Sequence, residues 1–192
     1  MKKVFLFCLA LVAAMSVSAE GLNDEISASR DRSAKLQALC NGYKTCGNAN
    51  IDGYGNSMRD AALFAIANSE QLEGMYKRQL GENKDGIQDV TVTKPTLDEW
   101  VALSVTVAGE GAKITEAVNM AQAAGEEAKK MAEDSSKEKN PMKAGKAAKQ
   151  AKAAAAVVTF GNEATPILLD ESAAQVKAIN EIINTIKSGN NL

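Results

Sequence analysis

The chain has 192 residues, a formal net charge of −2 and no histidine. The absence of histidine removes the commonest general base and the commonest transition-metal ligand, and the mild acidity argues against a nucleic-acid partner, which requires a concentrated basic face. Aromatic residues make up only 4% of the chain and alanine is abundant, a composition that favours closely packed helices over a sheet sandwich.

The first nineteen residues have the organisation of a secretory signal peptide. Lys2 and Lys3 precede the apolar run VFLFCLALVAAM, and the small residues Val17 and Ala19 lie at the −3 and −1 positions of a cleavage site. The apolar run is shorter than the roughly 20 residues that a membrane-spanning helix needs. We therefore expect cleavage after Ala19, a periplasmic or secreted protein, and a single helical domain over residues 20–192.

Helical periodicity predicts the first two helices at residues 22–40 and 57–80. Ser57 and Asp60 have the spacing of a helix-capping pair, and Gly81 is expected to end the second helix. The following segment, residues 82–94, contains an Asp-Gly turn signal and an alternating V-T-V-T run. A single short strand has no partner in a helical chain, so we expect an extended connection there.

Two long helices are predicted at residues 96–134 and 141–188, forming a hairpin on the order of 60 Å long. Thr96 and Glu99 form a capping box, and Pro141 suits a first helical turn. Pro166 is expected to kink or break the fourth helix. The expected heptad seams run through Trp100, Ser104, Val107, Gly111, Ile114 and Val118 in the third helix and through Leu169, Ser172, Val176, Ile179 and Ile183 in the fourth. Together these patterns predict an all-α, elongated, antiparallel four-helix bundle with coiled-coil-like packing.

No sequence pattern indicates an enzyme. The chain contains no G-x-S-x-G elbow, phosphate-binding glycine loop or dinucleotide fingerprint. Adjacent carboxylates such as Glu126 and Glu127 point in different directions from a helix, so they do not form a shared catalytic pair. We therefore expect a protein without catalytic residues or cofactors.

The stretch CNGYKTCGNANIDGYGNS, residues 40–57, suggests either a calcium loop or a turn. Asn48, Asn50, Asp52 and Gly53 match positions one, three, five and six of an EF-hand loop. Position twelve, however, is Arg59 instead of glutamate, and Asp52 is the only carboxylate in the loop. Asparagine and glycine are also common in turns because both tolerate positive φ angles, so we expect a turn without a metal ion.

Two cysteines in this stretch, Cys40 and Cys46, are expected to form a disulfide, because an exported chain meets an oxidising compartment. A redox or metal-binding thiolate pair is the alternative, but the C-x-x-C spacing is absent and two thiolates make only half a zinc site. The disulfide would staple an interhelical loop that presents a candidate contact surface. The contact candidates are Tyr43, Asn48, Asn50, Asp52 and Tyr54.

Four lysines recur every three residues in the fourth helix and form a basic stripe: Lys143, Lys146, Lys149 and Lys152. One interpretation is a peripheral membrane helix, which pairs a basic face with an apolar one. The favoured interpretation is a solvated face paired with acids of the preceding helix, with Glu126 opposite Lys149 and Glu133 near Lys143. The apolar side of this helix is mostly alanine, which inserts weakly into lipid.

These observations favour a non-enzymatic interaction or scaffold protein with an unidentified protein partner. The alternative is a membrane-active, pore-forming protein, because residues 61–69, 100–109 and 153–162 carry no charge. These segments are too short to span a bilayer and are more simply explained as bundle core. Seams rich in alanine and isoleucine can close within one chain or between two, so a homo-oligomer remains an open alternative.

Overall fold

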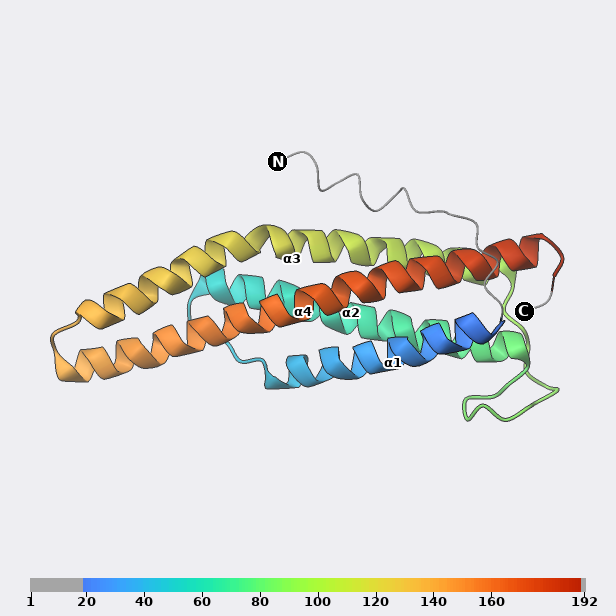
Figure 1. Ribbon diagram of the computed structural model, residues 1–192, viewed down its shortest axis with the longest axis horizontal. Helices are drawn as coiled ribbons and strands as arrows, with labels where there is room; N and C mark the ends of the chain where they lie inside the picture. Colours follow the sequence, from blue (N-terminus) through green and yellow to red (C-terminus); the bar gives the residue numbers. More distant parts are fainter. Residues whose placement is uncertain (1–18, 191–192) are drawn as a thin grey trace.

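The computed structural model describes residues 19–190 as a bundle of four long helices. The helices are α1 (Ala19–Gly42), α2 (Ala49–Leu80), α3 (Leu97–Lys137) and α4 (Pro141–Lys187). They run alternately up and down the long axis of an elongated molecule (Figure 1). This architecture confirms the predicted all-α antiparallel bundle. The predicted signal peptide, residues 1–19, lies outside the described residues except for Ala19.

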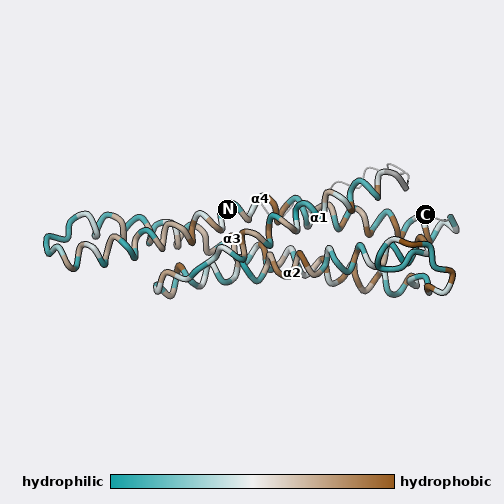
Figure 2. The backbone as a smooth tube through the Cα atoms, turned by 90° about the horizontal axis from the view of Figure 1, so that it is seen from below, coloured by the Kyte–Doolittle hydropathy of each residue, from teal (hydrophilic) through white to brown (hydrophobic). Residues whose placement is uncertain are grey.

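The helices differ in length, and this difference gives the molecule two regions. Helix α2 packs against all three other helices, whereas α1 contacts α2 and α4 but not α3. The hairpin of α3 and α4 continues past the end of α1 and the start of α2 (Figure 1). We call residues 129–152 the arm and the four-helix part the body. In Figure 2 the arm is mostly teal and white, the colours of hydrophilic and intermediate residues.

The body contains two apolar clusters. The arm-side core includes Leu36, Ile51, Tyr54, Ile114 and Leu168, together with both cysteines and several alanines. The far core lies toward the other end and includes Leu22, Leu72, Trp100, Leu103 and Ile182. The body also buries six polar residues, which we call the polar layer: Ser29, Asn68, Ser69, Glu110, Glu171 and Gln175. No helix within residues 19–190 is both long and apolar enough to cross a membrane.

Two glycines bring α2 and α4 close together in the arm-side core. A Cβ atom placed on Gly161 would lie 2.0 Å from the hydroxyl oxygen of Tyr54, and one on Gly55 would lie 2.6 Å from Val157. Glycine is unfavourable in a helix interior by roughly 0.5–1 kcal/mol relative to alanine. Here the missing side chain makes room for a buried tyrosine ring, so the packing accounts for the glycine.

Local capping signals correctly predict most helix ends. The Thr96–Glu99 capping box forms at the start of α3, and Asn140 caps α4 directly before Pro141. Gly81 ends α2 with a φ of 78°, in the left-handed region that favours glycine. The connection that follows forms no strand within the part of the chain described, only an isolated bridge between Glu82 and Gln88.

The predicted start of the second helix at Ser57 is wrong, because α2 begins at Ala49. The side chain of Asn48 accepts hydrogen bonds from the backbone N–H groups of Asn50 and Ile51, at 3.0 and 3.2 Å, and so caps the helix. Gly53 and Gly55, two of the four glycines that suggested a loop, therefore lie inside the first two turns of α2.

The predicted break at Pro166 is also wrong, because α4 is continuous through this residue. Proline removes the hydrogen bond to the carbonyl of residue 162, four positions earlier. Both Pro166 and Asn162 are exposed, so water can satisfy the freed carbonyl group. A proline on the solvent face can therefore be accommodated without ending the helix.

The predicted seams of α3 and α4 match the observed buried faces in part. Trp100, Val107 and Ile114 of α3 and Ile179 and Ile183 of α4 are buried as predicted. Helix α3 also buries Leu103 and Glu110 rather than the neighbouring Ser104 and Gly111. Helix α4 buries Leu168, Glu171 and Gln175, whereas Leu169 and Val176 are exposed. The positions that differ from the prediction place charged and amide side chains in the body.

Candidate functional site: the arm and its base

The connection between α1 and α2 is held by hydrogen bonds from its own backbone. The two carboxylate oxygens of Asp52 accept from the N–H groups of Cys46 and Gly47, at 2.7 and 2.9 Å. Gly47 has a φ of 84°, which a residue with a side chain rarely adopts. Asp52 thus organises a turn, and residues 19–190 contain no group of three Cys, Asp or Glu side chains placed to hold a metal ion.

This connection also anchors α3 at the base of the arm. The side-chain amides of Asn48 and Asn50 donate to the two carboxylate oxygens of Glu127, at 2.6 and 2.9 Å. Hydrogen bonds from Asn48 and Asn50 lower the pKa of Glu127, and the bond from Asn48 has the larger effect. A carboxylate at this place is further favoured by the positive end of the α2 dipole. Nothing in the spacing of the sequence identified Glu127, which lies 79 residues from Asn48.

The predicted disulfide is not formed, since Cys40 and Cys46 are free thiols. Both side chains are buried in the arm-side core, where they pack as small apolar groups. Burial raises the pKa of both thiols, so the reactive thiolate form is disfavoured. The hydrogen bonds of Asp52 and the cap at Asn48 hold the turn in place of a covalent staple.

The two tyrosines of this stretch pack in or against the arm-side core. Tyr54 is fully buried, so its prediction as a surface contact residue is wrong; its ring fills the space that Gly161 leaves. Tyr43 is partly buried, its ring centroid lies 5.0 Å from that of Phe160, and its hydroxyl donates to Asn56 at 3.0 Å. Both rings therefore stabilise the contact between the connection, α2 and α4.

The arm, by contrast, has almost no buried side chain. Ala151 is the only buried residue between positions 129 and 152. This segment carries eight lysines and three acidic residues, a net charge of +5, so the rest of the chain carries −7. The four lysines of the predicted stripe, Lys143, Lys146, Lys149 and Lys152, are all exposed. The arm therefore concentrates positive charge in an otherwise acidic protein.

The predicted ion pairs of Glu126 with Lys149 and of Glu133 with Lys143 are not formed. Lys137 and Glu133 make the only ion pair of the arm among the residues described, at 3.9 Å, with both side chains about 70% exposed. Such exposed pairs contribute little to stability. Seven of the eight arm lysines thus have no acidic partner within 4.0 Å.

The tip of the arm is a fixed turn that presents an apolar side chain among lysines. Asn140 accepts from the N–H groups of Met142 and Lys143, at 3.1 and 3.3 Å, while Glu138 accepts from the N–H of Asn140. The side chain of Met142 is 89% exposed. Lys139 and Lys143, also exposed, flank it in the sequence.

The polar layer is a second cluster that the sequence did not reveal. Glu171 is fully buried, and its Oε1 accepts from the hydroxyls of Ser29 and Ser69, both at 2.5 Å, and from Gln175 at 2.8 Å. Its Oε2 accepts from the guanidinium of Arg32 at 2.5 Å. Every helix except α3 contributes to this network. A buried charge is tolerated here because it is both paired and hydrogen-bonded.

Glu110 brings α3 into the polar layer. One carboxyl oxygen accepts from the side-chain amide of Asn68 at 2.8 Å, and the other is buried without a partner. Burial raises the pKa of Glu110 to about 7, opposed by the Asn68 hydrogen bond and increased by the nearby Glu171. Neither carboxyl group reaches solvent, so this pair lacks the access that a catalytic pair needs.

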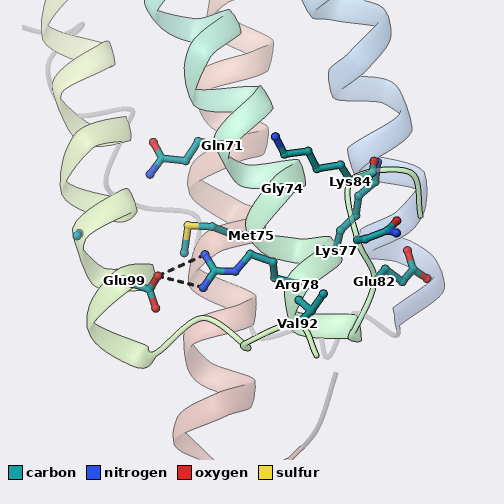
Figure 3. A pocket seen from close by; sticks show the side chains of 11 residues that line it. Gln71, Gly74, Met75, Lys77, Arg78, Glu82, Lys84, Val92 and Glu99 are labelled. Carbon is teal, nitrogen blue, oxygen red and sulfur yellow. Dashed lines mark hydrogen bonds and ion pairs between the residues drawn. The ribbon is translucent and has the colours of Figure 1, made fainter. Parts of the chain in front are cut away.

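A surface groove of about 620 Å³ lies at the far end of the body, between α2, α3 and the connection that joins them (Figure 3). Arg78 crosses it to reach Glu99 at 3.3 Å and the carbonyl of Thr93 at 3.0 Å. Lys77 is bonded to Glu73 at 2.8 Å and to the carbonyl of Lys84 at 3.1 Å. These cations hold the connection against the helices and are therefore already engaged.

Comparisons with known proteins do not extend this description. No protein-family model, curated protein or solved structure matches the chain.

Proposed function

We propose that this protein is an exported, non-enzymatic interaction module that uses the arm as its contact surface. The observation that carries the proposal is a hairpin that continues beyond the body with seven unpaired lysines and one buried alanine. Such a segment adds little apolar burial to the fold, and its like charges repel one another. A contact role explains why the chain has an extension that contributes so little to the core.

The base of the arm supports the same function. Glu127 is clamped by Asn48 and Asn50, so α3 leaves the body in a defined direction. A contact surface on a directed support loses less conformational entropy on binding than one on a mobile loop. The connection predicted as a contact loop thus serves as the support of the contact surface.

The remaining clusters favour a protein without catalysis. Glu110 and Glu171 have no access to solvent, and two cations of the groove, Lys77 and Arg78, are bonded to Glu73, Glu99 and backbone carbonyls. The export part of the proposal rests on the signal-like pattern of residues 1–19. A periplasmic or secreted location follows from that pattern.

The alternative function is a pore-former that inserts an uncharged hairpin. In the structure, the three uncharged segments supply core residues that include Ala61, Trp100 and Val157. Insertion would therefore require both cores to open, which makes this alternative the weaker one. Dye leakage from vesicles would distinguish pore formation from surface contact.

Site-specific photo-crosslinking in the producing cell tests the proposed function. A photo-reactive residue replaces Lys146 or Gln150 in the arm, and Val105, which is 69% exposed on the body, provides the matched control. We expect discrete adducts from the arm positions and none from the body position. Adducts from position 105 alone, or equal adducts from all three, would show that the arm is not the contact surface.

A shortened arm gives a second, independent variant. Deletion of residues 130–136 and 143–149 removes one heptad from each helix and keeps the phase of the hairpin. We expect adducts at position 150 to disappear while the helical circular dichroism of the body is retained. Full crosslinking by this variant would contradict the proposal.

A further inference from the structure

We propose that the tip of the arm docks end-on against the surface of an anionic lipid membrane. This inference rests on the proposed function and names the partner of the same surface. The tip, residues 137–143, contains Lys137, Lys139 and Lys143, one acidic residue, Glu138, and the exposed Met142. A cluster of lysines around an exposed apolar side chain suits the interface between lipid headgroups and acyl chains.

The placement of the lysines favours an end-on approach over a helix lying flat. Lysines three residues apart on a helix are displaced by about 60° from one another, because each residue turns by about 100°. The stripe from Lys143 to Lys152 therefore winds around about half of α4. No single side of α4 collects the charge of this stripe, whereas the tip brings three lysines together.

The arm is long enough to separate the basic tip from the negative charge of the body. Outside the arm the chain carries a net charge of −7, which an anionic membrane would repel. Residues 129–140 raise the tip by roughly 18 Å at 1.5 Å per residue. This distance exceeds the screening length of about 8 Å at physiological salt. The tip can therefore reach the membrane while the repulsion of the acidic body is screened.

The residue types favour lipid over nucleic acid as the anionic partner. Residues 129–152 contain no arginine and no aromatic residue. Binding of single-stranded nucleic acid commonly uses aromatic stacking, and bidentate recognition of phosphate uses arginine. Lysines act as point charges, and each contributes about 1 kcal/mol of attraction near an anionic membrane. Attraction to the charge of a lipid surface requires only exposed lysines, and the tip provides them.

Co-flotation with vesicles tests this inference. The chain used comprises residues 20–192, which include all four helices but not the apolar run of residues 4–15, because that run would itself bind lipid. Vesicles of phosphatidylcholine are compared with vesicles of phosphatidylcholine and phosphatidylglycerol in equal parts. We expect flotation only with the anionic vesicles, decreasing as salt is raised, and no dye leakage.

Matched variants assign the effect to the tip. Replacement of Lys137, Lys139 and Lys143 by glutamine should weaken the partition on the order of 100-fold, from three charges at about a factor of five each. The control replaces Lys84, Lys94 and Lys187, three exposed lysines of the body, by glutamine and should leave flotation nearly unchanged. Met142→Ser should weaken partition by up to about tenfold, through loss of apolar burial.

Several results would overturn the inference. These are an absence of flotation, equal flotation with neutral vesicles, equal loss in the tip and control variants, and dye leakage, which would indicate insertion. Salt-sensitive self-association or binding to soluble polyphosphate, without vesicle binding, would identify another anionic partner. Arm-specific crosslinks to a protein without flotation would leave the proposed function standing and remove the membrane as its partner.

Discussion

In the body, α3 and α4 bury Trp100, Leu168 and Ile182 against α1 and α2, whereas beyond Met131, which still contacts Asn48 of the body, the two helices of the arm extend past α1 and α2. The arm buries Ala151 alone. Burial of one methyl group contributes about 1 kcal/mol, while a single large core side chain contributes roughly 1.5–3 kcal/mol. Continuous helices can therefore have very different local stabilities along their length.

The buried network of the body should respond most strongly to mutation. Arg32→Ala removes the cation that faces the fully buried Glu171 carboxylate. Because an uncompensated charge would remain in the body, we expect a loss of about 3–4 kcal/mol in the free energy of unfolding. Urea denaturation followed by circular dichroism measures this loss.

The matched change in the arm is Lys137→Ala, which removes the exposed pair with Glu133. We expect a loss of less than about 0.5 kcal/mol in the free energy of unfolding, because the remaining Glu133 carboxylate is exposed and stays solvated. Equal effects of Arg32→Ala and Lys137→Ala would contradict the contrast between the two regions.

A pH dependence of stability should arise from Glu110. Its pKa is about 7 in the folded protein, raised mainly by burial, against an ordinary value of 4.5. The folded state therefore holds the proton more tightly than the unfolded state. The resulting stabilisation is complete below pH 4.5 and is lost as pH rises to about 7, by on the order of 3 kcal/mol. The charged and polar groups that face Glu110 are Glu171 on α4 and Asn68 on α2, with Arg32 of α1 bonded to Glu171.

Glu110→Gln provides the test, since glutamine is neutral at every pH. We expect its stability to change little between pH 4.5 and 7, whereas the unmodified protein loses stability over that range. Glu73 acts in a separate window. Hydrogen bonding to Arg30 lowers its pKa to about 2, so its contribution is present above pH 4.5 and is lost as pH falls toward 2. If the stability of the unmodified protein and that of the Glu110→Gln variant depend on pH in the same way above pH 4.5, Glu110 is not the titrating group.

Two glycines of α4 allow the same substitution in both regions. Gly161→Ala places a Cβ atom 2.0 Å from the hydroxyl oxygen of Tyr54, which is fully buried and cannot move aside. We expect a loss of about 2–3 kcal/mol from overpacking. At Gly145 in the arm a Cβ atom meets nothing within 4 Å, so Gly145→Ala should increase helix stability locally by up to about 1 kcal/mol. Thermal unfolding of the two variants compares the effects, and a stabilising Gly161→Ala would show that α2 and α4 are less closely packed there.

Local sequence signals predicted the class of fold and most helix ends, because caps depend on residues three or four positions apart. The Thr96–Glu99 box is of this kind, and Pro141 and Gly81 are single residues that favour a helix start and a helix end. The α2 start failed because glycine reads as a turn former in isolation. The actual role of Gly55 depends on Tyr43 and Val157, which approach it only in the folded bundle.

The polar layer was missed for a related reason. A charged residue in a helical pattern reads as solvent-facing, and only the partners on other helices show that it is buried. Glu171 receives hydrogen bonds from Ser29 and Ser69, which lie 142 and 102 residues away. The same limitation explains the predicted pairs of the arm. Charge pattern alone did not determine the register in which α3 and α4 face each other, so lysines expected to be paired are unpaired.

Shortening the arm itself should also have only a small effect on stability. Deletion of residues 130–136 and 143–149 removes four lysines and no buried side chain. Because one kcal/mol corresponds to roughly 2–4 °C in a domain of this size, we expect the melting temperature to change by less than about 3 °C. Amide hydrogen exchange checks the same point in the intact protein. Amides of the arm should exchange through local opening, while those near Trp100 and Leu168 should exchange only on global unfolding. A large fall in melting temperature, or equal protection of both regions, would mean that the arm is part of the cooperative fold, and its extension would then need no function in binding.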